Sequence, residues 1–291
     1  MHLTFLGTGA ATAVPLPFCT CPTCRAARVR GGRDRRRRSS LLIGGALLID
    51  LGPDTVQAML DCGKDLTAVQ ALLVTHAHSD HFDPGHFVTR LADYACKEPA
   101  PLLLSCSETG LRRLSDSMER EEADTRVDTE SGRARLRVRI HPNVPGEAFD
   151  AAGYRITALY SRHDPAVDSR LYVVDDGQKR VLYATDTPAP GPDFYEALGA
   201  LGKPLDCAIF DHTYGPDLPD SGTAAPRPDH MSAHDVARAA RTLRERGLLA
   251  PDGPVYATHI SHEGTPLFEE LDAFARANGY RIAWDGLELD I

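Results

Sequence analysis

Short apolar stretches separated by polar turns recur along most of the 291-residue chain. Runs of apolar or β-branched residues bounded by Gly, Pro, Asn or Asp are typical of strands. The pattern predicts strands over residues 3–6, 40–43, 46–50, 71–74, 101–105, 136–140, 154–160, 170–175, 180–185, 207–211 and 255–258. Gly44-Gly45, between the second and third of these, indicates a tight hairpin.

Amphipathic segments between the strands predict helices. They cover residues 22–30, 55–62, 84–95, 107–121, 193–201, 232–246 and 265–278. Ser232, followed three residues later by Asp235, is typical of a capped helix start. Residues 122–135 are polar and lack a period, so we expect an irregular excursion there. Strands in two groups, each followed by helices and without a break in composition, predict a single α/β domain over residues 1–291.

Composition and charge narrow the class of protein. Hydrophobic residues make up 42% of the chain and charged residues 25%, as in ordinary globular proteins. No apolar run approaches the ~20 residues needed to span a bilayer, and the start lacks the charged region of a signal peptide. We therefore expect a cytoplasmic protein without a membrane partner. The net charge of −9 argues against nucleic acid as a partner, but not against a small anionic substrate; a homodimer is compatible with the sequence.

Four metal-binding side chains directly follow the apolar run 71–74. They are His76, His78, Asp80 and His81. Imidazole nitrogens and carboxylate oxygens are the usual ligands of zinc, manganese and iron. One metal cannot comfortably take all four groups from so short a loop. We therefore predict two neighbouring metals, with His76 and His78 on one and Asp80 and His81 on the other.

Further ligand-type residues follow other predicted strands. His163 comes after the strand 154–160, Asp186 after 180–185 and His259 after 255–258. Asp50 ends the strand 46–50 and could orient a metal-bound histidine from behind.

These residues together resemble the HxHxDH signature of the metallo-β-lactamase superfamily. The resemblance implies that His76, His78 and His163 hold one divalent metal, zinc or manganese. It implies that Asp80, His81 and His259 hold the other, with Asp186 as the bridge. It also implies a four-layer αββα sandwich, with the metals at the edge where the strands end.

Three of the seven cysteines are clustered as C-x-C-x-x-C in the loop around residues 18–30: Cys19, Cys21 and Cys24. In a reducing compartment such a cluster indicates a metal site rather than a disulfide, although exposed redox thiols are the alternative. A tetrahedral structural zinc needs four ligands, and His262 is the candidate for the fourth. The remaining cysteines are expected to be ordinary buried thiols: Cys62, Cys96, Cys106 and Cys207.

The cysteine loop indicates a particular subfamily within this superfamily. A three-cysteine loop closed by the second histidine of Thr258-His259-Ile260-Ser261-His262 resembles the phosphoribosyl 1,2-cyclic phosphate phosphodiesterases of the carbon–phosphorus lyase pathway. So do the opening L-G-T-G-A at 6–10 and the closing W-D-G-L-E-L at 284–289. Those enzymes carry a structural zinc beside a binuclear catalytic centre. The resemblance implies hydrolysis of a small cyclic phosphodiester, such as a ribosyl 1,2-cyclic phosphate, through a metal-bridging hydroxide.

Asp80 and His230 are the residues that we assign to catalysis. In the resembled phosphodiesterases a histidine ahead of the same helix assists catalysis without binding metal, which makes His230 the candidate proton donor. His212, at the exit of strand 207–211, could touch substrate or support the metal ligands equally well. His234 is a further substrate-contact candidate, although the second helical position favours packing or capping.

Other functions of the same fold stay open. One is a hydrolase of cofactor or natural-product biosynthesis, resembling the pyrroloquinoline quinone pathway member, which usually departs from the intact HxHxDH pattern. Another is an RNA-processing nuclease, which shares the metal ligands but would be expected to add a clamping arm. A metallo-β-lactamase typically has a cysteine in place of Asp186 and is exported. The variable stretches 107–135 and 213–229 would carry differences in substrate.

The chain has a single dense basic run, R-G-G-R-D-R-R-R-R at residues 30–38. Such runs are usually solvated loops. This one could instead meet a phosphate or an acidic face of another subunit.

Overall fold

The computed structural model describes residues 1–94, 97–218 and 228–291. Its first sheet has seven strands in the order β14-β1-β2-β3-β4-β5-β6. These strands are β1 (His2–Gly7), β2 (Ser40–Ile43), β3 (Leu47–Ile49), β4 (Ala71–Leu73), β5 (Leu102–Cys106), β6 (Val138–Pro142) and β14 (Glu288–Asp290). The carboxyl-terminal β14 pairs with β1, so the two ends of the chain lie side by side.

The second sheet also has seven strands, in the order β13-β12-β11-β10-β9-β8-β7. They are β7 (Ala148–Ala151), β8 (Tyr154–Tyr160), β9 (Arg170–Asp175), β10 (Arg180–Ala184), β11 (Cys207–Asp211), β12 (Val255–Thr258) and β13 (Arg281–Ile282). Strands β10 to β13 run parallel to one another, as do β3 to β6 in the first sheet.

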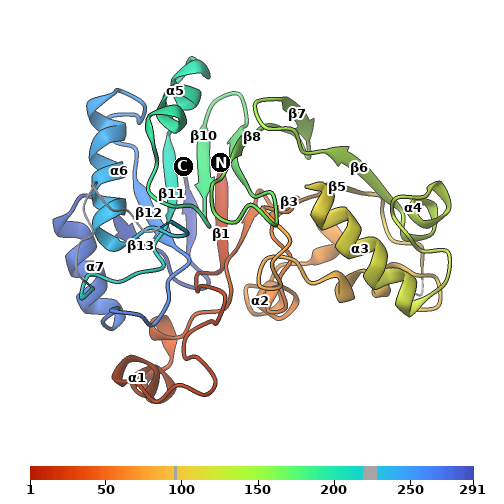
Figure 1. Ribbon diagram of the computed structural model, residues 1–291, viewed down its shortest axis with the longest axis horizontal. Helices are drawn as coiled ribbons and strands as arrows, with labels where there is room; N and C mark the ends of the chain where they lie inside the picture. The colour runs from red at the N-terminus through yellow and green to blue at the C-terminus, as the bar shows by residue number, and fades with distance from the viewer. Residues whose placement is uncertain (95–96, 219–227) are drawn as a thin grey trace.

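Helices cover the outer face of each sheet. The α-helices of the described residues are α1 (Pro22–Arg30), α2 (Thr55–Asp61), α3 (Glu108–Glu121), α4 (Glu130–Leu136), α5 (Pro192–Ala200), α6 (Ala233–Glu245) and α7 (Phe268–Ala277). In Figure 1, α5, α6 and α7 lie on one side of the sheets and α3 and α4 on the other, while α1 lies apart from both groups at the lower edge. The predicted αββα sandwich is confirmed.

Strand side chains alternate between two apolar environments. In β2, Leu41 and Ile43 pack between the sheets, whereas Leu42 packs under the helices of the first outer layer. In β10, Tyr183 faces the other sheet and Leu182 faces α5 and α6. Because both faces are buried, these strands are apolar at nearly every position, which is why the sequence predicts them well.

The order of parallel strands decides where polar side chains gather. The carboxyl ends of neighbouring parallel strands open at the same edge of a sheet. Strands β4, β10 and β12 therefore present their following residues at one edge of the sandwich.

Several predicted elements differ from the structure. Residues 84–95 were expected to form one helix, but the helical turn is a 3₁₀-helix over Pro84–Arg90, and residues 95 and 96 lie outside the described residues. The predicted irregular stretch 122–135 contains α4, because the Thr129 hydroxyl accepts a hydrogen bond from the Gly132 amide and Leu136 packs into the core. Strands β7, β13 and β14 were not predicted from the sequence.

The basic run 30–38 is ordered against the protein rather than solvated along its length. Arg36 is buried and donates hydrogen bonds to the Thr8 hydroxyl and the Ala283 carbonyl. Arg38 pairs with Asp54. The interpretation as a plain solvated loop is therefore wrong.

The remaining cysteines, the loop 213–229 and the lengths of the helices were also subjects of sequence predictions. Cys106 and Cys207 are buried thiols as predicted, whereas Cys62 is half-buried and Cys96 lies outside the described residues. Of the loop 213–229, residues 219–227 also lie outside them. Within the described part of the chain, no helix is long and apolar enough to cross a membrane.

Candidate metal centre

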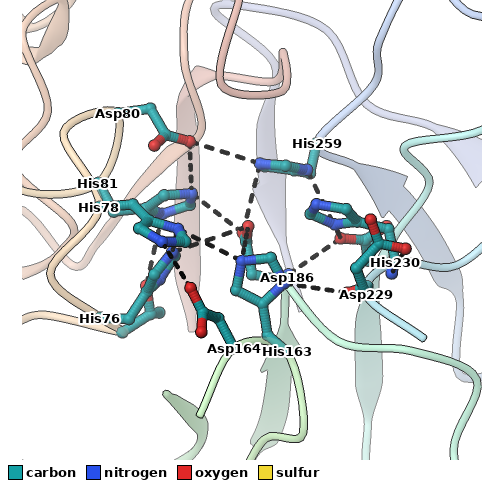
Figure 2. A network of polar contacts seen from close by, with 12 residues as sticks. His76, His78, Asp80, His81, His163, Asp164, Asp186, Asp229, His230 and His259 are labelled. Atoms are coloured by element: carbon teal, nitrogen blue, oxygen red, sulfur yellow. Dashed lines mark hydrogen bonds and ion pairs between the residues drawn. The ribbon is translucent and has the colours of Figure 1, made fainter. Parts of the chain in front are cut away.

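Seven histidine and aspartate side chains meet at the edge where the strands end. The loop after β4 supplies four of them, and the segments after β8, β10 and β12 supply one each: His76, His78, Asp80, His81, His163, Asp186 and His259. Figure 2 shows Asp186 between the imidazoles of the 76–81 loop and His259. All seven were predicted from the sequence, and the fold brings all seven together.

Three imidazoles form the first group. Nε2 of His76 lies 2.9 Å from Nδ1 of His78, and Nε2 of His163 lies 3.3 Å from the same Nδ1. Burial keeps the pKa of His76 well below its usual value, so the neutral form that binds metals prevails. These three nitrogens are close enough together to share one cation.

A carboxylate and two imidazoles form the second group. Oδ2 of Asp80 lies 3.0 Å from Nε2 of His81 and 3.7 Å from Nε2 of His259. Burial alone would lower the pKa of His81, but the carboxylates of Asp186, Asp80 and Asp50 raise it well above its usual value. The carboxylates thus attract positive charge to this position, whether the charge is a proton or a metal ion.

Asp186 connects the two groups. Its Oδ1 lies 3.6 Å from Nε2 of His163 and 3.9 Å from Nε2 of His76. Its Oδ2 lies 3.0 Å from Nε2 of His81 and 3.3 Å from Nε2 of His259. Each oxygen therefore faces one group, which is the arrangement that two cations sharing a carboxylate require.

Three buried atoms in this cluster lack a hydrogen-bond partner among the described residues. They are Nε2 of His81, Oδ2 of Asp186 and Nε2 of His259. An unsatisfied buried polar atom costs about 1–3 kcal/mol. A cation bound among them would use the lone pairs of all three, so the donor set fits a metal.

The backbone is strained where it aims these side chains. Asp186 and His259 have φ angles of +52° and +58°, and Asp50 has a φ of +65°. Non-glycine residues avoid this left-handed region at a cost of about 1–3 kcal/mol each, and such strain concentrates at functional sites. Here it turns the chain sharply at the ends of β3, β10 and β12.

Further side chains orient the cluster from behind. Asp50 accepts at 2.6 Å from Nδ1 of His81 and also from the Thr75 hydroxyl, so its predicted contact with the 76–81 loop is confirmed. The Thr213 hydroxyl lies 2.8 Å from Nδ1 of His259. On the open side, Asp164 lies 3.2 Å from Nε2 of His78. These contacts leave the opposite ring nitrogens directed toward the centre.

His230 lies beside the two groups, and one of its ring nitrogens is within 4.8 Å of ligand atoms of Asp186, Asp211 and His259. Its ring is 5.2 Å from that of His259 and 4.6 Å from that of His163. Its Nδ1 lies 2.9 Å from Oδ2 of Asp211. Burial would lower the pKa of His230, but the charge of Asp211 outweighs burial and raises it to about 9. The charge of Asp211 thus favours the protonated form of His230.

Asp211 is a functional residue that the sequence did not predict. It is buried and accepts hydrogen bonds from the Asp186 amide and the Thr213 hydroxyl as well as from His230. Asp211 ends a strand next to the one that precedes Asp186, so its position at a strand exit could have identified it.

His212 and His234 do not reach the cluster. His212 is fully buried, and its Nε2 lies 3.1 Å from the Tyr280 hydroxyl. Because successive residues of a strand point to opposite faces, Asp211 faces the cluster and His212 faces away. The predicted substrate contact of His212 is wrong. His234 packs its ring against Phe274 at 5.7 Å, as its position in the helix favoured.

The cysteine loop forms a separate group with His262. Sγ of Cys21 lies 3.5 Å and Sγ of Cys19 lies 3.7 Å from Nδ1 of His262. Cys24 completes a set whose ligand atoms all lie within 4.8 Å of one another. The three thiols are free. Cys21 also caps α1, because its Sγ accepts from the Cys24 amide. Three thiols and one imidazole suit a tetrahedral zinc.

The chain is similar to known proteins in both sequence and structure. A ribonuclease Z from Pyrobaculum calidifontis is 25% identical in an alignment 250 positions long, which covers 75% of this chain and 77% of that protein. A crystal structure of a diphosphatase from the PhnP family matches with a TM-score of 0.71 and 25% identity, covering 100% of this chain and 97% of that one. Zinc-bound PqqB from Methylobacterium extorquens matches with a TM-score of 0.71 and 20% identity over 100% of both chains, and shares the fold.

The profile of the beta-lactamase superfamily domain matches residues 46–260. This stretch begins just before β3 and ends one residue after His259, so it contains all seven residues of the cluster. Proteins of this fold bind divalent metals, and the two groups of imidazoles and carboxylates supply the ligand atoms for them. The chain therefore belongs to the beta-lactamase superfamily, as a metallo-hydrolase fold with its metal-binding side chains intact.

Proposed function

We propose that this protein is a binuclear metal-dependent phosphodiesterase that hydrolyses a small cyclic phosphodiester, such as a ribosyl 1,2-cyclic phosphate. The observation that carries the proposal is the position of Asp186, with one oxygen toward each group of ligands and with His230, held by Asp211, beside them. A shared carboxylate supports two metals at short range, and a separate proton donor suits the expulsion of an alkoxide.

The ligand sets follow the two groups. His76, His78 and His163 would hold one metal, zinc or manganese, and Asp80, His81 and His259 would hold the other, with Asp186 between them. When bound, the metals would activate a water as nucleophile and neutralise the charge that develops on the phosphoryl group. The Asp80 carboxylate would accept a hydrogen bond from the attacking water. A third metal, a structural zinc, would be held by Cys19, Cys21, Cys24 and His262.

His230 would act as the general acid. Its Nδ1 is engaged by Asp211, so Nε2 is the nitrogen free to donate a proton to the departing oxygen. The buried Asp211 carboxylate keeps the imidazole protonated and fixes its orientation. His230 lies two residues before Ser232, the N-cap of α6, and the positive end of the helix dipole favours a phosphate nearby.

The matched proteins favour phosphate chemistry over acyl transfer. The names of two relatives at 25% identity denote a diphosphatase and a ribonuclease, both of which cleave bonds to phosphorus. The ribonuclease match makes RNA processing the second candidate function. The net charge of −9 counts against an RNA substrate, because RNA-binding surfaces are basic.

A substrate panel tests the proposal. Purified protein would be assayed with manganese, zinc or nickel on an aryl phosphodiester, a ribose 1,2-cyclic phosphate, a 2′,3′-cyclic nucleotide, a precursor transfer RNA, a β-lactam and a thioester. We expect the small diesters to turn over and the matching monoesters to be inert. Asp186→Asn should lose this turnover, because it removes the charge between the two ligand groups. Asp193→Asn, on the surface of α5, is its matched control and should keep the turnover. Hydrolysis of the β-lactam or the thioester alone would contradict the proposal.

A further inference from the structure

Four arginines of the basic run surround a surface hollow of ≈ 500 Å³. Arg33, Arg35, Arg36 and Arg37 line it together with Trp284 and Asp285. None of these residues belongs to the histidine–carboxylate cluster or to the cysteine group. The hollow is thus a separate feature, and its volume falls within the ~300–1,000 Å³ range of small-molecule sites.

One of the four arginines is structural. The guanidinium of buried Arg36 donates to the Thr8 hydroxyl at 2.8 Å and to the Ala283 carbonyl at 2.7 Å. These contacts join the basic run to β1 and to the segment that follows β13. They hold the neighbouring arginines in place around the hollow.

The other three arginines keep donor groups free. The guanidinium of Arg33 lies 4.0 Å from the ring centre of Trp284, and no carboxylate among the described residues pairs with it. Arg35 uses Nε and Nη2 on the carbonyls of Ala27 and Arg28. Arg37 pairs with Asp61 through Nη2. The Nη1 groups of Arg35 and Arg37 and the whole edge of Arg33 have no protein acceptor among the described residues.

The acidic residue in the lining does not neutralise the hollow. One oxygen of Asp285 accepts from the Thr8 hydroxyl and the other from the Arg37 amide. Four arginines face two carboxylates, Asp285 and the Asp61 that pairs with Arg37, so the lining stays positive although the whole chain carries a net charge of −9. Like charges held this close repel one another, and a bound anion would relieve the repulsion.

We propose that this hollow binds a small organic phosphate that carries a pyrophosphate group, of the nucleoside diphosphate class. The planar fork of arginine matches phosphate oxygens with two parallel hydrogen bonds. Two adjacent phosphates would use the free edges of Arg35 and Arg37. The Arg33–Trp284 stack offers a flat surface on which a base can lie.

The hollow is connected to the metal-site edge through two short backbone contacts. The Gly9 amide donates to the Arg37 carbonyl at 2.6 Å, and the Ile260 amide donates to the Thr8 carbonyl at 2.9 Å. Ile260 directly follows His259. A ligand in the hollow would therefore contact residues that are hydrogen-bonded to the strand end carrying His259, without contacting the cluster itself.

Trp284 allows a direct binding test, because it is the only tryptophan in the chain. Its fluorescence would be followed while ADP, inorganic pyrophosphate or adenosine is added to the intact protein at constant ionic strength. We expect a saturable change with ADP and pyrophosphate and none with adenosine. A tighter fit for ADP than for pyrophosphate would assign the base to the Arg33–Trp284 surface.

Substitutions of the arginines in the hollow test whether ADP binds there rather than elsewhere on the surface. Arg35→Gln and Arg37→Gln should each weaken ADP binding about tenfold or more, the effect of one lost charged hydrogen bond. Arg112→Gln, an exposed arginine of α3, is the matched control and should leave binding unchanged. Calorimetry repeats the measurement independently of the fluorophore. Unchanged affinity in both hollow variants, or an equal response to adenosine, would overturn the proposal. Neither result bears on the proposed hydrolysis.

Discussion

The histidine–carboxylate cluster and the cysteine group each take a histidine from the segment after β12, His259 and His262, yet they are held in different ways. His76, His81 and His259 are almost completely buried and follow strands packed on both faces. Cys19 and Cys21 are half-buried in an irregular loop. The first cluster is positioned by the core of the sandwich. The second lies in a loop held by the Arg28 guanidinium, which donates to the carbonyls of Cys19 and Leu16, so we expect a bound metal to add to these few contacts and to matter for its folding.

Removing a cysteine ligand should have the largest effect. Cys21→Ser breaks the proposed zinc site and the cap of α1 together. Binding of structural zinc is worth an apparent ~10–16 kcal/mol in small zinc peptides, and this free energy is folding free energy. We expect a lower soluble yield, loss of one metal per chain and protease cleavage within residues 16–30. Elemental analysis and limited proteolysis measure these effects.

Cys62→Ser is the control for this change, since Cys62 is a half-buried thiol outside the cluster. It should keep the metal content and the yield. A soluble Cys21→Ser protein with its full metal content and activity would show that the cysteine group is not a metal site.

Asp186→Asn should separate activity from folding. The substitution keeps the shape of the side chain but removes the charge that both ligand groups share. Turnover of an aryl diester should fall at or beyond the upper end of the ~10²–10⁴ range of a single catalytic group. The melting temperature should change little in comparison with Cys21→Ser, because the core holds the cluster. Substantial unfolding of Asp186→Asn would contradict the contrast drawn between the two clusters.

His230→Ala should lower turnover by ~10²–10⁴ while leaving the metal content unchanged. The loss should shrink for a diester with an activated aryl leaving group, which departs without a proton. Because the pKa of His230 is raised to about 9, the donor is protonated below this pH. Turnover of unactivated diesters should therefore fall as the pH rises through about 9.

Asp211→Asn tests whether His230 is the proton donor. Removing the adjacent negative charge lowers the pKa of His230, so the alkaline decline should move to lower pH. A pH profile identical to that of the unchanged protein, or an equal loss on activated and unactivated diesters in His230→Ala, would remove His230 from the proton transfer.

Asp50→Asn should have the smallest effect. Asp50 supports His81 from behind at 2.6 Å, and loss of such a partner typically costs ~10–100-fold in metal affinity. Titration of a chelator against bound metal measures this loss. Asp65→Asn, which alters an exposed cap of a short helical turn, is the control. Unchanged affinity would mean that strand packing alone orients His81.

Some features were predictable because their residues are close in sequence. The loop from His76 to His81, the cysteine loop and the Ser232–Asp235 capping box each lie within a few residues. His163, Asp186 and His259 were identified by their positions after apolar strands and by resemblance. The order of buried strands then suffices to place them at one edge, because parallel strands end on the same side.

The tertiary structure decided in which direction side chains point, because their positions in the sequence do not determine this. Asp211 and His212 are adjacent at one strand exit, but only packing against Tyr280 shows which of them faces the cluster. Arg36 of the basic run is ordered by Thr8 and Ala283, which are distant in sequence. The sequence by itself determined the ligand types and their order along the chain. Which atoms face each other depends on contacts between distant segments, and no local pattern encodes those contacts.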